Sequence, residues 1–258
     1  MIGTSSEGKN FDLLDPSSVN WREAIEAACA NLDAISPVFL PVVELAKRQV
    51  KGYELLARFS SGPPAPPGMW FESAAKLGLT APLERRIMRT GFATADAMPE
   101  GTFLAVNITA EALISPQLQE LFQQRQRYDN LVLEVSENDV QQPGVAEALT
   151  AFRAGGGRLA VDDIGSGFSN LRDVLLLKPD ILKVDRAIIR GVDRDKTKLA
   201  IVEGLGRMAT RMEIPLLAEG IEKREELSVL EQLGVPLGQG YLFGEPSPRF
   251  GGPPAAEG

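Results

Sequence analysis

Acidic and amide side chains recur at one end of the short apolar runs along this chain. They form a spaced set: Glu54, Asn107, Glu134, Asp162, Asp163, Asp185, Glu219 and Gln239. Carboxylate and amide oxygens are the donors that Mg²⁺, Mn²⁺ and Ca²⁺ prefer. If these acids meet in one pocket, their like charges repel, and either a cation neutralises them or some of them take up protons. The set therefore predicts a divalent metal site.

The composition removes most other catalytic chemistry. The chain has no histidine and a single cysteine, Cys29. Without imidazole or a second thiol it can form no Ser-His-Asp triad, no Cys-His dyad, no internal disulfide and no structural zinc site of the usual kind. What remains is carboxylate, amide and lysine chemistry, with any metal held by oxygen.

The elements that must position these side chains follow a regular alternation. Short β-branched or leucine-rich runs alternate with longer amphipathic stretches, which is typical of a mostly parallel sheet with helices between its strands. The predicted strands are Val38–Glu44, Gln49–Leu55, Phe103–Asn107, Leu131–Val135, Arg158–Asp162, Ile181–Asp185, Pro215–Glu219 and Gly240–Phe243. The predicted helices are Trp21–Leu32, Trp70–Leu77, Leu83–Ala97, Pro116–Arg127, Gly144–Ala154, Asn170–Leu177, Lys196–Met212 and Lys223–Leu233.

The connections between the strands predict how they pair. Only a few residues around Ala46–Arg48 separate the first two strands. A crossover helix does not fit there, so these strands should be antiparallel neighbours. The rest of the pattern predicts an α/β fold, a (β/α)₈ TIM-like barrel with an antiparallel first strand. The carboxyl ends of barrel strands meet at one face, where active sites are built, so the polar set should meet there.

The length and the chain ends indicate one domain. The chain has 258 residues, and we expect flexible tails at 1–20 and 247–258 around a barrel at 21–246. The formal net charge of -8 argues against duplex DNA as a partner. No apolar stretch is long enough to cross a bilayer, and the first twenty residues lack the pattern of a signal peptide. We therefore expect a cytoplasmic protein without membrane insertion.

The polar residues lie in motifs that resemble those of one family. Glu54–Arg58 resembles the E-A-L-x-R signature of EAL-domain proteins, the bacterial phosphodiesterases of cyclic di-GMP, and Asp162–Leu171 resembles their D-D-F-G-T-G-Y-S-S-L. Further matches in the family's order are Val106–Thr109 with its asparagine strand, Glu134–Glu137 with E-x-T-E, Lys183–Asp185 with K-I-D, Glu219–Glu222 with E-G-V-E and Gln239–Gly244 with Q-G-Y-x-F-G. The resemblance implies hydrolysis of cyclic di-GMP to linear pGpG, which lowers the level of this second messenger.

The resemblance also implies a role for each matched residue. Two ions, Mg²⁺ or Mn²⁺, would be bound, one by Glu54, Asn107, Glu134 and Asp162 and the other by Asp162, Asp163 and Asp185. Ca²⁺ is expected to inhibit, because it takes more ligands at longer distances. The catalytic set would be Glu219 beside the attacking water, Lys183 orienting that water or stabilising charge, Gln239, and Glu137 anchoring the loop Ile164–Asn170. Substrate would contact Leu56, Glu222 and, through a phosphate, Arg58.

General chemistry supports this assignment. Two cations a few Å apart lower the pKa of a shared water and neutralise the charge that develops on a phosphodiester under attack. Because side chains alternate along a strand, Lys183 and Asp185 face the same side. The lysine is therefore expected to point into the same lumen as the acids.

Two departures from the family pattern leave an alternative open. Leu55 replaces the alanine of the signature, and Leu40 precedes Pro41 where the family usually has a glutamine on the substrate side. An apolar side chain cannot replace the hydrogen bonds of an amide. The alternative is a catalytically weak or inactive receptor that signals by binding cyclic di-GMP. A second alternative is an unrelated barrel enzyme that uses Mg²⁺ on another phosphate or carboxylate substrate. The resemblance further suggests a homodimer, and a separate partner is one route for regulation.

Overall fold

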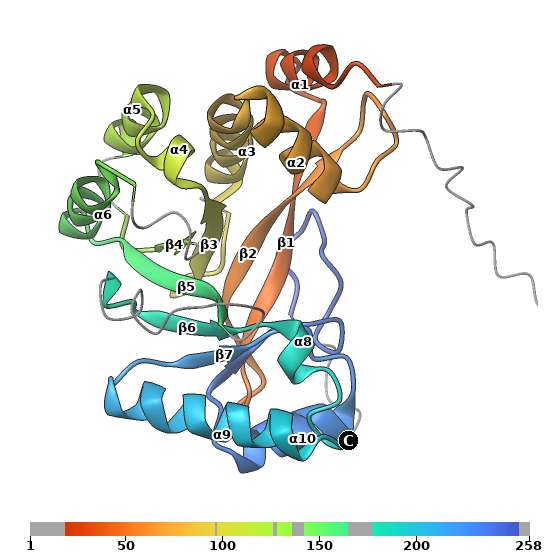
Figure 1. Cartoon of the computed structure of the whole chain (residues 1–258), viewed down its shortest axis with the longest axis vertical. Helices are drawn as coiled ribbons and strands as arrows, with labels where there is room; N and C mark the ends of the chain where they lie inside the picture. The colour runs from red at the N-terminus through yellow and green to blue at the C-terminus, as the bar shows by residue number, and fades with distance from the viewer. Residues whose placement is uncertain (1–18, 96, 126–127, 136–141, 165–176, 253–258) are drawn as a thin grey trace, which may run out of the picture.

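The computed structural model describes residues 19–95, 97–125, 128–135, 142–164 and 177–252, with Asp163 and Ile164 described for their backbone alone (Figure 1). The strands are β1 Ile35–Glu44, β2 Gln49–Phe59, β3 Phe103–Ile108, β4 Leu131–Val135, β5 Arg158–Ile164, β6 Ile181–Val184, β7 Leu216–Ala218 and β8 Leu237–Gly238. They close into a barrel in the order β1-β2-β3-β4-β5-β6-β7-β8. The predicted α/β barrel is confirmed.

The first strand runs against its neighbours. β1 pairs antiparallel with both β2 and β8, and the other neighbouring strands are parallel. The turn between β1 and β2 is too short for a helix, so the chain must reverse directly. Figure 1 shows the two strands as one long twisted ribbon. The antiparallel first strand is confirmed, and its register places Leu40 opposite Glu54.

Helices cover the outside of the barrel. They are α1 Trp21–Ala30, α2 Pro67–Leu77, α3 Thr80–Ala95, α4 Ala110–Leu113, α5 Pro116–Arg125, α6 Val145–Ala154, α8 Arg186–Ile189, α9 Lys196–Arg211 and α10 Arg224–Gln232. Most lie within a few residues of their predicted bounds, while α4 and α8 are single turns that the sequence pattern did not indicate. The predicted helix Asn170–Leu177 lies almost wholly outside the described residues. None of the described helices combines the length and the apolar character that crossing a membrane requires.

The core has two apolar layers separated by the sheet. A large cluster lies between the strands and the helices. A smaller one fills the barrel interior and consists of Val42, Phe103, Ala105, Val132, Ala160, Ile181, Leu217 and Leu237. Because side chains alternate along a strand, the residue two positions beyond each interior residue also faces inward. This alternation positions the candidate site described below.

The predicted last strand, Gly240–Phe243, is wrong. β8 is the preceding pair Leu237–Gly238, and the apolar run after Gly240 forms a turn in which Phe243 N–H donates to the Gly240 carbonyl at 3.0 Å. Gly240 has φ +150°, and a Cβ there would lie 2.3 Å from the backbone of Ile221. The chain therefore bends against the loop after β7 at a residue that must be glycine.

The first residues of the predicted C-terminal tail contact the first hairpin. Ser247 and Phe39 exchange backbone hydrogen bonds of 2.8 and 3.1 Å, which adds an antiparallel bridge to β1. The Phe250 ring packs with its centroid 4.3 Å from that of Phe39 and 5.0 Å from that of Tyr53. The end of the domain thus covers the outer side of the first hairpin.

We predict that Phe250→Ala destabilises the protein by about 2 kcal/mol, because it removes two aromatic contacts from a half-buried position. Thermal unfolding should show Tm lowered by about 5 °C for a domain of this size. Tyr241→Ala is the control, since Tyr241 is 62% exposed and its removal should leave Tm unchanged. An unchanged Tm in Phe250→Ala would show that the C-terminal residues do not stabilise the barrel.

Candidate active site

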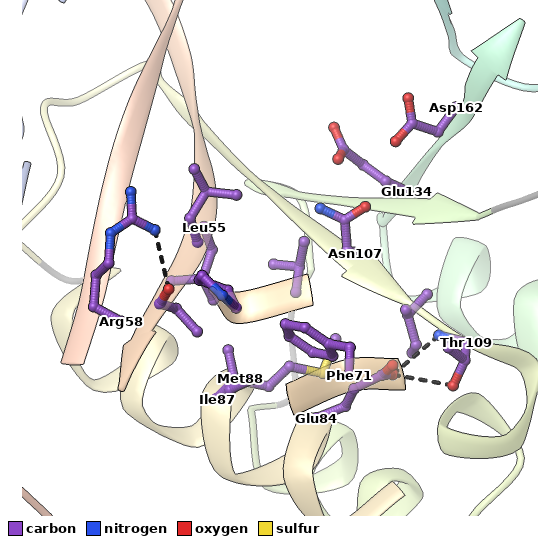
Figure 2. A pocket seen from close by; sticks show the side chains of 15 residues that line it. Leu55, Arg58, Phe71, Glu84, Ile87, Met88, Asn107, Thr109, Glu134 and Asp162 are labelled. Carbon is purple, nitrogen blue, oxygen red and sulfur yellow. Dashed lines mark hydrogen bonds between the residues drawn. The ribbon is translucent and has the colours of Figure 1, made fainter. Parts of the chain in front are cut away.

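The candidate site is the polar layer that lies above the apolar layer inside the barrel. Six members follow a residue of that apolar layer by two positions: Asn107 after Ala105, Glu134 after Val132, Asp162 after Ala160, Lys183 after Ile181, Glu219 after Leu217 and Gln239 after Leu237. Glu54 follows Gly52, which pairs with Phe103 of the same layer. Figure 2 shows Asn107, Glu134 and Asp162 on successive strands along one side of a pocket. The strand ends therefore bring these seven polar residues to one place.

Two amides hold the carboxylate of Glu54. Asn107 Nδ2 donates to Glu54 Oε1 at 2.9 Å, and Gln239 Nε2 donates to Glu54 Oε2 at 2.7 Å. Glu54 and Gln239 are both buried. The carboxylate is thus fixed from β3 on one side and from the end of β8 on the other, so the barrel has to close for Glu54 to be oriented.

A single ammonium group joins three further acids. Lys183 Nζ lies 2.8 Å from Glu134 Oε2, 3.3 Å from Asp162 Oδ1 and 2.6 Å from Glu219 Oε1, and its side chain is 1% exposed. The acids come from β4, from β5 and from the residue after β7. A backbone hydrogen bond of 3.1 Å from Glu219 N–H to the Val184 carbonyl keeps that residue beside β6.

Burial and crowding shift the protonation of these groups. Burial raises the pKa of Glu134 well above its ordinary value; Lys183 opposes this shift and the neighbouring carboxylates add to it. The pKa of Glu219 is raised to about 8, again chiefly by burial. For Lys183, burial lowers the pKa, but the surrounding carboxylates outweigh burial and hold it well above its ordinary value. The site therefore keeps its ammonium charged, while burial and crowding make Glu134 and Glu219 take up protons more readily than ordinary carboxylates.

A cavity of about 370 Å³ opens beside the acids. Asn107, Glu134 and Asp162 form its polar side, and Phe71, Ile87 and Met88 contribute to its apolar side. Figure 2 shows Arg58 at one side of this pocket, where its Nη1 donates to the carbonyl of Ala57 at 3.1 Å. The pocket thus combines an acidic wall, an apolar wall and an exposed guanidinium.

The donor set suits a hard divalent cation. If ionised, the described acids Glu54, Glu134, Asp162 and Glu219 carry four negative charges against one positive charge on Lys183. The Gln239 side-chain oxygen is buried without a hydrogen-bond partner among the described residues, which leaves one more oxygen donor in the site. No three acids among the described side chains surround a common point as in a formed metal site. Instead, the ammonium of Lys183 lies among Glu134, Asp162 and Glu219.

Other predicted residues lie around this centre. Leu56 lines the pocket with Arg58. Asp185 caps α8, where its Oδ1 accepts a hydrogen bond of 2.7 Å from Ala187 N–H. Glu222 is not among the residues lining the pocket and pairs with Arg190 at 2.9 Å. Glu137 lies outside the described residues, as does the side chain of Asp163, so their predicted roles stay predictions.

The sequence analysis missed one pocket residue, Glu84. Its carboxylate is buried on α3, and its Oε2 accepts hydrogen bonds from Thr109 N at 3.0 Å and Thr109 Oγ1 at 3.3 Å (Figure 2). The signal was present in the helix pattern. Glu84 stands at the i, i+3, i+4 spacing with Ile87 and Met88, so a charge lies on an apolar face. Such a residue has to find hydrogen-bond partners inside the fold.

The chain is similar to several known proteins. It is 31% identical over 237 residues to the probable cyclic di-GMP phosphodiesterase PdeG of Escherichia coli, and this match covers 87% of the chain but 47% of PdeG. The structure resembles the manganese/cyclic di-GMP complex of Klebsiella pneumoniae BlrP1 with a TM-score of 0.74 at 29% identity, over 85% of this chain and 58% of that one. It resembles the calcium/cyclic di-GMP complex of BlrP1 with a TM-score of 0.75 at 27% identity, over 94% and 69%.

A family-level match covers the whole barrel. The chain spans about half the length of PdeG, so the similarity concerns about half of that protein. The sequence profile described as "EAL domain" matches residues 21–246, which include every residue of the polar layer. The chain therefore belongs to the EAL domain family.

Proposed function

We propose that this chain hydrolyses cyclic di-GMP to linear pGpG with the help of two divalent ions, Mg²⁺ or Mn²⁺. The observation that carries the proposal is the convergence of Glu54, Glu134, Asp162 and Glu219 beside a cavity of about 370 Å³. Similarity to PdeG and BlrP1 supports the choice of substrate, since those proteins are named for or bound to cyclic di-GMP. The manganese in the BlrP1 complex supports the choice of cofactor.

The residues that would hold the ions are the strand-end acids. We assign Glu54, Asn107, Glu134 and Asp162 to one ion and Asp162, Asp163 and Asp185 to the other. When bound, the ions supply a water of lowered pKa and neutralise charge on the phosphate. Asn107 and Gln239 fix the direction of Glu54 through their hydrogen bonds, so they act by positioning.

The groups that act on the reacting atoms would be Glu219, Lys183 and Arg58. Glu219 is assigned to accept a proton from the attacking water, and burial together with the nearby acids suits a carboxylate to that task. Lys183 lies 2.6 Å from Glu219 Oε1 and supplies a fixed positive charge next to it. Arg58 would bind a substrate phosphate at the pocket, through charge-assisted hydrogen bonds.

One observation favours the receptor alternative. Leu40 lies opposite Glu54 across the antiparallel pair, so both side chains project from the same face of the sheet. Leu40 is buried and has no group that can hydrogen-bond a ligand. A site that has its acids but lacks this amide could bind cyclic di-GMP weakly or turn it over slowly.

The decisive experiment is hydrolysis of cyclic di-GMP with Mg²⁺, Mn²⁺, Ca²⁺ or EDTA in parallel. We expect linear pGpG with Mg²⁺ or Mn²⁺ and little or none with Ca²⁺, because Ca²⁺ takes more ligands at longer distances. Equal rates with Ca²⁺ would contradict the two-ion assignment. Binding of cyclic di-GMP without turnover in any metal would establish the receptor alternative.

We predict that Glu219→Gln lowers kcat by about 10²–10⁴-fold, the usual contribution of a positioned acid or base, with substrate binding retained. Glutamine keeps the shape of the side chain and removes its ability to take the proton. Glu203→Gln is the matched control, because Glu203 pairs with Arg207 on the outside of α9. Turnover of Glu219→Gln at the parent rate would transfer the role to another acid.

We predict the opposite kinetic pattern for Arg58→Ala. Loss of a charged hydrogen bond costs about 1.5–3 kcal/mol, so KM should rise about tenfold or more while kcat changes little. Arg58→Lys should give an intermediate KM, since lysine keeps the charge but lacks the planar guanidinium group that can bind a phosphate with two parallel hydrogen bonds. If Arg58→Ala lowers kcat and leaves KM unchanged, Arg58 acts on the transition state alone.

We predict that Leu40→Gln lowers KM for cyclic di-GMP about fivefold, the value of one net hydrogen bond of about 1 kcal/mol. Leu40→Met is the control, because it keeps an apolar side chain of similar volume and should leave KM unchanged. Steady-state kinetics with both variants at saturating Mn²⁺ provide the measurement. An equal effect of both substitutions would assign the change to packing around Leu40.

A further inference from the structure

The surroundings of Lys183 resemble those of a bound cation more than those of an ordinary salt bridge. Its ammonium is 1% exposed and lies 2.6–3.3 Å from carboxylates on three different chain segments. These contacts are close ion pairs, so one positive charge faces Glu134, Asp162 and Glu219 at once.

The fourth acid is held in a different way. Glu54 accepts its hydrogen bonds from the amides of Asn107 and Gln239, which bring no positive charge. Among these described contacts, Lys183 therefore supplies the positive charge that faces the acids. Without it, buried carboxylates would face one another uncompensated, a state that is strongly destabilising.

We propose that Lys183 is the resident counter-ion of the acid cluster: it holds the carboxylates together when no metal is bound, and it competes with divalent cations for them. This inference rests on the proposed function only in treating the cluster as a metal site. A positive charge beside the cluster weakens its attraction for further cations. The lysine therefore lets the barrel fold without metal and sets a weaker metal affinity than the acids alone would have.

The test compares Lys183→Met with the parent protein by thermal unfolding in EDTA and in Mn²⁺, and by calorimetric titration with Mn²⁺ alone. Methionine keeps an unbranched side chain and removes the charge. We expect a lower Tm in EDTA, a larger rise of Tm on adding Mn²⁺, and a Kd for Mn²⁺ at least tenfold lower than that of the parent. A variant that folds only with Mn²⁺ would be the strongest form of this result.

Arg86→Met is the matched control. Arg86 is a buried cation outside the acid cluster, and it donates to the carbonyls of Asn31 and Leu32 near the end of α1. Its loss should lower Tm equally in EDTA and in Mn²⁺ and leave the Kd for Mn²⁺ unchanged. The comparison separates loss of a buried cation in general from loss of the cation at the metal site.

Three results would overturn the proposal: a parent-like Tm of Lys183→Met in EDTA, an equal loss of Tm with and without Mn²⁺, or an unchanged or weaker affinity for Mn²⁺. If Lys183→Met does not fold in either condition, the double variant Lys183→Met/Glu219→Gln decides, because it removes one charge of each sign. Recovery of folding supports the counter-ion role, and failure to fold assigns Lys183 to packing. None of these measurements uses cyclic di-GMP, so they stand even if the protein hydrolyses nothing.

Discussion

The ion pairs of Lys183 with Glu134, Asp162 and Glu219 are the interaction on which the rest of the site depends. Buried carboxylates are tolerated in a protein interior only when they are paired or hydrogen-bonded. The lysine provides that pairing from β6, in the arc of the barrel between β5 and β7. The strands can therefore bring acids together at their carboxyl ends and still close over an apolar layer beneath them.

The orientation of Glu54 in the site depends on closure of the barrel. Glu54 is fixed by Asn107 from the adjacent strand and by Gln239 from the chain segment after β8, which closes the barrel against β1. A change that opens the seam between β1 and β8 would release one of the two amides. The bridge between Ser247 and Phe39 and the packing of Phe250 reinforce the hairpin on its outer side. Distant residues at the chain's end therefore support the acid centre through β1.

The sequence predicted those features that depend on local pattern. The position of Glu134 near the end of the apolar run Leu131–Val135 is enough to place it with the other strand-end acids, and the short turn after Glu44 is enough to make β1 antiparallel. Features that depend on contacts between distant residues could not be predicted from the sequence. β8 has two residues and no period to detect, whereas the apolar run after Gly240 has the composition of a strand but bends where Gly240 approaches the backbone of Ile221. The helix pattern marks Glu84 as a charge on an apolar face, but its partner Thr109 lies far along the chain, as do the ring partners of Phe250, and no local pattern shows them.

The charges of the site also set the order in which ligands can bind. A phosphodiester is anionic, and every carboxylate of the cluster that is ionised repels it across the pocket wall formed by Glu134 and Asp162. Arg58 attracts a phosphate, but it is an exposed single charge at the pocket's edge. If the proposed function holds, divalent cations must therefore be bound before the substrate can approach the acids. In that case Lys183 would keep the site assembled until the metals bind, and the bound metals would weaken its ion pairs with the carboxylates and make the pocket attractive to phosphate.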